Sequence, residues 1–104
     1  MNKTKIEQAA FEIISFAGAA KALFSEAIDL ISQNNLKTAK DKIKEGKLEL
    51  AKVHKAHFEL ISFESQGNQL EFSLLLVHAE DQFMSAENAM FLAEKLLILP
   101  HKNS

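Results

Sequence analysis

The chain has 104 residues, 47% of them hydrophobic, and a formal net charge of −2. This length suits one domain with a single core, so we expect one domain over residues 1–104. The sequence contains no Arg and no Cys, which excludes bidentate Arg contacts to phosphate, disulfide bonds, thiolate zinc sites and cysteine nucleophiles. This composition, with its acidic balance, argues against nucleic-acid binding.

The N-terminal sequence does not resemble a targeting segment. Polar and acidic residues interrupt its first apolar stretch, and no small-residue cleavage site follows. No apolar run reaches the ~20 residues that a membrane-spanning helix needs. We therefore expect a soluble, cytoplasmic protein.

Chain breakers divide the sequence into three segments. Breaks fall at residues 32–35 (SQNN) and 65–68 (SQGN), and Pro100 follows the last apolar run. The segments between them are rich in Ala, Leu, Glu and Lys, which favour helix, and each is roughly 25–30 residues long. We predict an all-α fold, an antiparallel up-down-up three-helix bundle, in which Gly18 and Gly46 allow close helix packing.

The third predicted helix is apolar on more than one side. One broad apolar face comprises Phe72, Leu76, Ala79, Phe83, Ala86, Met90, Ala93 and Leu97. A second row repeats at seven-residue spacing: Val77, Met84, Phe91 and Ile98. A helix with two apolar sides is buried on two sides, which three helices alone hardly provide. We expect a homo-oligomer with this helix at the interface; the alternative is a monomer whose helices pack loosely.

A polar line runs between the two apolar rows. It contains His78, Asp81, Ser85 and Asn88, at the alternating spacing of a coiled-coil seam. Around a symmetry axis each Asp81 would meet its own copies, which is unfavourable unless some are protonated or a cation binds between them. The pattern thus allows a metal ion at Asp81; a solvated or salt-bridged carboxylate is the simpler alternative.

Histidines offer the main candidates for chemistry. Asp81 lies one turn after His78 and could orient its ring, leaving a neutral imidazole to act as nucleophile, base or ligand. A simple hydrogen-bonded His is the alternative. His54 and His57 have helical metal-ligand spacing, but no HExxH motif accompanies them, and ordinary surface or packing histidines are the better interpretation. His101 lies beyond Pro100, where we expect the chain to fray.

Lysines cluster in the second predicted helix. Lys37, Lys40, Lys44 and Lys47 fall along one face, which we interpret as solvated. Aromatic residues do not alternate with them, so a nucleic-acid groove is not expected. A docking patch for a protein partner is the other possibility.

Two sequence blocks resemble a known family. The first is FEIISFAGAAKALFSEAI at residues 11–28, and the second runs from VHKAHFELI to SFESQGNQLEFSLLLVHAEDQFM. Their order, loop and spacing are similar to those of enzyme IIA of the lactose/cellobiose (lactose/chitobiose) class of the bacterial phosphoenolpyruvate-dependent sugar phosphotransferase system. The family motif there is SLLLVHAQDHLM or a near variant.

The resemblance implies a homotrimer that forms a nine-helix bundle. It also implies a specific reaction. His78 would accept a phosphoryl group from phospho-HPr and pass it to the IIB component. The membrane-embedded IIC component would then transport and phosphorylate a disaccharide of lactose, cellobiose or chitobiose type. Asp81 would bind one divalent metal ion per trimer on the trimer axis, with Mg²⁺ the expected species. The protein would thus be a phosphotransferase that meets the membrane only through IIC.

The chain departs from the family pattern near this motif. Glu80 replaces a Gln and Gln82 replaces a His, while Ala19 and Lys21 stand where the family often has Asp or Asn and Arg. Glu80 points roughly 160° away from His78 on its own helix, but could approach the His78 of a neighbouring chain. Gln82 can hydrogen-bond without carrying charge. The alternative function is therefore a non-catalytic trimeric regulator or scaffold that kept the fold.

Overall fold

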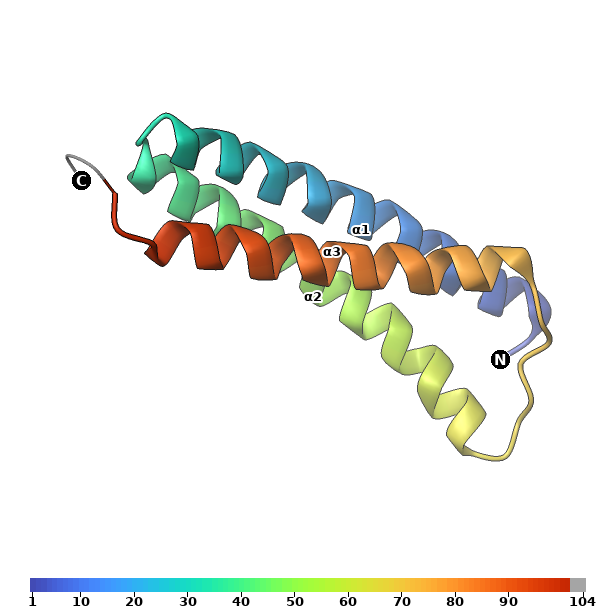
Figure 1. Ribbon diagram of the computed structural model, residues 1–104. Helices are drawn as coiled ribbons and strands as arrows, with labels where there is room; N and C mark the ends of the chain where they lie inside the picture. The colour runs from blue at the N-terminus through green and yellow to red at the C-terminus, as the bar shows by residue number, and fades with distance from the viewer. Residues whose placement is uncertain (102–104) are drawn as a thin grey trace.

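The computed structural model describes residues 1–101. It consists of α1 (Lys3–Ser32), α2 (Leu36–Ser65) and α3 (Leu74–Ile98), with no strand within those residues. Figure 1 shows α1 and α3 running in the same direction, with α2 returning between them along the chain. The predicted all-α, up-down-up three-helix unit is confirmed. None of the three helices is long and apolar enough to cross a membrane.

Side-chain caps begin two of the helices. The Asn2 side chain accepts a hydrogen bond from the Lys5 backbone N–H at 2.8 Å, and Ser73 accepts one from Leu76 at 3.0 Å. Each bond satisfies a backbone donor that the first helical turn leaves unpaired. The Ser73 cap starts α3 after Phe72, so Phe72 lies in the connection and is 86% exposed. Its predicted place on the broad apolar face of the third helix was therefore wrong.

The two connections differ in length. Residues 33–35 form a tight turn in which Asn34 adopts a positive φ of 60°. The second connection spans residues 66–73, longer than the predicted break, with Gly67 at φ 93° just after α2. Figure 1 shows this segment extended between the end of α2 and the start of α3, where the two helices diverge.

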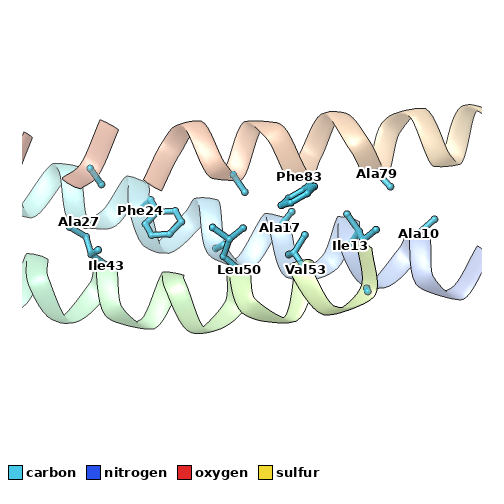
Figure 2. Packing of buried hydrophobic residues seen from close by; sticks show 14 of the residues in the cluster. Ala10, Ile13, Ala17, Phe24, Ala27, Ile43, Leu50, Val53, Ala79 and Phe83 are labelled. Atoms are coloured by element: carbon cyan, nitrogen blue, oxygen red, sulfur yellow. The ribbon is translucent and has the colours of Figure 1, made fainter. Parts of the chain in front are cut away.

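The core lies along α1, which packs against both other helices. Many of its buried residues are small, so the helices approach closely (Figure 2). The fully or almost fully buried alanines are Ala9, Ala10, Ala17, Ala20 and Ala27 of α1, Ala39 and Ala56 of α2, and Ala79, Ala86 and Ala93 of α3. Phe24, Ile13 and Val53 are the largest fully buried side chains, and Phe83 enters the same core from α3.

The two helical glycines have different roles. A Cβ added at Gly46 would lie 2.6 Å from the Phe24 ring, so the absence of a side chain there permits the α1–α2 contact, as predicted. A Cβ added at Gly18 would meet nothing within 4 Å. The prediction of close helix packing at Gly18 is therefore wrong within one chain, because this residue faces outward from α1.

One face of α3 remains exposed in the single chain. The second apolar row of the sequence pattern is 48–73% exposed, from Val77 to Ile98. Met84 and Phe91, between them, are 61% and 57% exposed. The core face predicted for Ala79, Phe83, Ala86 and Ala93 is buried. The three-helix unit thus covers only one of the two apolar sides of α3.

His101 contacts the end of α3. The His101 Nε2 atom lies 3.1 Å from the backbone oxygens of both Leu96 and Leu97. These carbonyls belong to the last turn of α3, whose acceptors lack helical partners. This contact of the imidazole with the helix end was not predicted from the sequence, where fraying beyond Pro100 was expected.

The glycine contrast gives a stability test. We expect Gly46→Ala to destabilise the fold by about 1–2 kcal/mol, because overpacking against the buried Phe24 ring outweighs the gain in helix propensity. Gly18→Ala, the matched control, should be neutral or stabilising by up to about 1 kcal/mol. Urea unfolding at equal protein concentration measures both. Equal effects of the two substitutions would contradict the assigned packing.

Candidate functional site

His78 and Asp81 lie on consecutive turns of α3, and both are exposed. Within residues 1–101 neither side chain makes a hydrogen bond or an ion pair. The structure therefore leaves the imidazole accessible to another molecule. The suggested orientation of its ring by Asp81 does not occur through a hydrogen bond in the single chain.

Gln82 links the His78 turn to α1. Its Oε1 atom accepts a hydrogen bond from the Lys21 ammonium group at 3.5 Å, and both residues are partly buried. Gln82 is four residues after His78, so the two side chains are neighbours on the same face of α3. A cation from α1 thus stands one helical turn from the candidate nucleophile.

Glu80 is held on the opposite side of α3. Its Oε1 atom lies 2.6 Å from the Nε2 atom of His57 on α2. The His57 side chain is 20% exposed and that of Glu80 49% exposed. The direction of Glu80 away from His78, expected from helical geometry, is therefore confirmed. The contact with His57 places this carboxylate against α2. Its charge is turned away from the His78 of its own chain.

A second His–carboxylate contact lies beside the first. His54 Nε2 is 3.6 Å from Glu87 Oε2, and the rings of His54 and His57 lie 5.1 and 4.6 Å from that of Phe83. Phe83 is almost fully buried, and both imidazoles pack against its ring. His54 is thus an exposed surface histidine and His57 a half-buried packing one, in agreement with the interpretation as surface or packing histidines.

The chain by itself does not assemble a metal centre. Within residues 1–101 no group of three or more His, Cys, Asp or Glu side chains could hold a metal ion. Asp81 offers one exposed carboxylate, and Ser85 and Asn88 follow it on the polar line. Oxygen donors of this kind suit Mg²⁺. One carboxylate per chain fits an ion only where several chains meet.

A comparison with family models identifies the chain. The model described as "PTS system, Lactose/Cellobiose specific IIA subunit" matches residues 8–100. The chain belongs to this family. It is thus a component of a sugar phosphotransferase system, with the phosphocarrier role and the transferase class of such components.

Individual IIA proteins are similar over most of their length. The lactose-specific EIIA component of Staphylococcus aureus (strain N315) is 32% identical over 85 residues, which cover 82% of each chain. The lichenan-specific enzyme IIA component of Bacillus subtilis (strain 168) is 33% identical, covering 94% of this chain and 89% of the other. The crystal structure of PtcA from S. mutans superposes with a TM-score of 0.89 at 32% identity, covering 93% and 95% of the two chains.

Sequence reasoning missed the contacts between helices at this IIA site. It singled out Lys21, Glu80 and Gln82 as departures from the family pattern, but it paired none of them. Lys21 and Gln82 are 61 positions apart, and His57 and Glu80 are 23 apart. Only the relative position of the packed helices brings each pair together. The departure of Lys21, Glu80 and Gln82 from the family pattern was the one feature of the sequence that marked these residues as relevant to the site.

The His57–Glu80 contact predicts a measurable coupling. In a double-mutant cycle with His57→Gln and Glu80→Gln, we expect a coupling energy of about 0.5–1 kcal/mol, because Glu80 is half exposed and screened by solvent. Urea unfolding of the four proteins provides the values. The matched cycle with His54→Gln and Glu87→Gln, at the longer distance, should give a smaller coupling. A larger coupling in that second cycle would refute the assignment.

Proposed function

We propose that this chain carries a phosphoryl group on His78. The unprotonated ring nitrogen of His78 attacks the phosphorus of phospho-HPr, and a new N–P bond forms. The N–P bond of the donor histidine breaks, and its electron pair returns to the donor ring. The His78 ring releases its N–H proton as the donor ring takes one up. The covalent phosphoimidazole divides one long transfer into two short ones.

The accessibility of His78 is the observation that carries this proposal. A carrier must present its histidine to a donor and an acceptor in turn, so a sealed imidazole could not serve. His78 is exposed on α3 and has no hydrogen-bonding partner within residues 1–101. In contrast, His54 and His57 are engaged by carboxylates and Phe83. Phosphoryl transfer depends mainly on positioning and charge stabilisation, which an open helical surface can provide.

The acceptor in this proposal is a cysteine of the IIB component. Its thiolate attacks the phosphorus on His78, the N–P bond breaks, and the electron pair returns to the ring, which regains a proton. The IIC component then transports a disaccharide, whose hydroxyl group attacks the phosphorus on the IIB cysteine; the S–P bond breaks, the sulfur keeps its electron pair and the hydroxyl proton is released. The names of the relatives include lactose and lichenan, so related IIA chains serve different sugars. We therefore propose a disaccharide of lactose, cellobiose or chitobiose type as the substrate class.

The working form that we propose is a homotrimer. Its support is the exposed apolar row of α3, from Val77 through Met84 and Phe91 to Ile98. Exposed apolar side chains along one side of a helix are unfavourable in water, and burial between copies of α3 removes this exposure. The neighbouring chains would also border His78 while leaving it open to the two carriers.

The trimer brings three Asp81 carboxylates toward one axis. Like charges in proximity repel, so a divalent cation, with Mg²⁺ as the expected ion, would stabilise this arrangement. Asp81 makes no ion pair in the single chain, and its oxygens are therefore free for such an ion. The chemistry supplied by the ion is structural charge neutralisation, and the phosphoryl transfer is assigned to His78.

The carrier function predicts a specific labelling pattern. With radiolabelled phosphoenolpyruvate, enzyme I and HPr, but without ATP, we expect one phosphoryl group per chain, on His78. His78→Ala should abolish the label, because the nucleophile is gone. His54→Gln and His57→Gln are matched controls and should retain it. An unlabelled wild-type protein would instead favour the non-catalytic regulator or scaffold.

The trimer and its ion can be tested together by native mass spectrometry with Mg²⁺. We expect the wild-type protein to give trimers with one ion per three chains. Phe91→Asp should give monomers without the ion, because three charges would enter an apolar interface. Asp81→Asn should leave the trimer intact but without the ion, since neutral side chains no longer repel.

Leu48→Asp is the control for introducing a charge. Leu48 is 64% exposed, like Phe91, but lies on α2. This variant should remain trimeric and bind the ion. A wild-type monomer, or a Phe91→Asp trimer, would refute the proposed interface, and a trimer without an ion would refute the role of Asp81.

A further inference from the structure

We propose that Lys21 of α1 binds the phosphoryl group while His78 carries it, which makes Lys21 a phosphate-contacting residue of the transfer site. The inference rests on the proposed phosphocarrier function and extends it to a residue on another helix. Its basis is the hydrogen bond from the Lys21 ammonium group to Gln82 Oε1 at 3.5 Å. That contact places a positive charge beside the turn that bears His78.

The position of Gln82 determines how far Lys21 must move. Gln82 and His78 are four residues apart on one helix, and the Cβ atoms at this spacing are about 5–6 Å apart. The long, flexible Lys21 stem therefore needs only a small rotation to move its ammonium group from the amide oxygen toward a phosphoryl oxygen on His78. A neutral amide holds the lysine weakly, whereas a phosphoryl group offers several charged acceptors.

An open position on α1 lies at about the level of His78. Gly18 lies one turn before Lys21, just as His78 lies one turn before Gln82, and α1 and α3 run in the same direction (Figure 1). Gly18 is therefore approximately level with His78. A Cβ added at Gly18 would meet no other part of the chain within 4 Å. The surface of α1 is thus open at about the level of His78, one turn before Lys21.

The charges around His78 create a need for this cation. A phosphoryl group on the ring adds negative charge to the turn at residues 78–82, which itself contains no lysine. Within residues 1–101, no other lysine is joined to the 78–82 turn by a hydrogen bond or an ion pair. His57 pairs with Glu80 on the far side of the helix. Lys21 is therefore the cation placed to offset the added negative charge.

The test measures the equilibrium of phosphoryl exchange between phospho-HPr and the protein for three substitutions of Lys21. We expect Lys21→Ala and Lys21→Gln each to shift the equilibrium about tenfold away from phospho-His78, because a charge-assisted contact is lost. Lys21→Arg keeps a cation and should stay within about threefold of the wild type. Lys37→Ala, which removes an exposed and unpaired lysine of α2, is the matched control and should have no effect.

Salt provides a readout that a structural role would not change. The exchange equilibrium should favour phospho-His78 more in the wild type than in Lys21→Gln. This difference should shrink as ionic strength rises toward 1 M, since the interaction is electrostatic and partly exposed. Thermal melting of the unphosphorylated variants identifies any loss of fold. Among folded variants, a difference in exchange equilibrium between Lys21→Gln and Lys21→Arg then shows that the charge at position 21 matters. If the wild type is labelled but Lys21→Ala and Lys21→Gln match Lys37→Ala, the role of Lys21 is refuted and the carrier function stands. If the wild type is not labelled, the carrier function itself fails.

Discussion

The close approach of α1 and α3 along their buried alanines is the contact on which the rest of the structure depends. Ala10 and Ala17 on α1 and Ala79 and Ala86 on α3 have almost no exposed surface. Small side chains let the two helices pack closely and in one relative position, since a shift would force larger residues into the same space. This position places Lys21 beside Gln82 and leaves His78 on the open side of α3. The site is therefore a product of helix packing, without any dedicated loop.

The second side of α3 combines two requirements that conflict in a single chain. Its exposed row of Val77, Met84, Phe91 and Ile98 is apolar, while the line beside it carries His78 and Asp81. Burial of the row stabilises an assembly, but complete burial would close off the histidine. The proposed trimer would resolve the conflict, because the apolar row would meet its copies while His78 stayed accessible between neighbours. The proposed ion at Asp81 then removes the remaining charge repulsion.

The departures of this chain from the family motif also become interpretable. Glu80 adds a negative charge to the turn that bears His78, the proposed phosphoryl acceptor, yet its carboxylate contacts His57 on α2. Gln82 lacks the positive charge that a histidine could carry, but it accepts a hydrogen bond from Lys21. The two changes are thus compatible with a working transfer site, because one charge is turned away and a cation from another helix stands close by. Both contacts join residues that are distant in the sequence.

The sequence by itself determined the three-helix architecture, the family and the candidate nucleophile. Helical periodicity and the breaks between segments follow local rules, and the VHAED stretch around His78 carries the family resemblance without reference to neighbours. Local rules did not give the length of the 66–73 connection, the exposure of Phe72, the open surface at Gly18 or the contact of His101 with the end of α3. They also did not predict which partners Lys21, His57, Glu80 and Gln82 contact. Only the tertiary structure decided these partners, because the distance between side chains on different helices depends on how the helices pack.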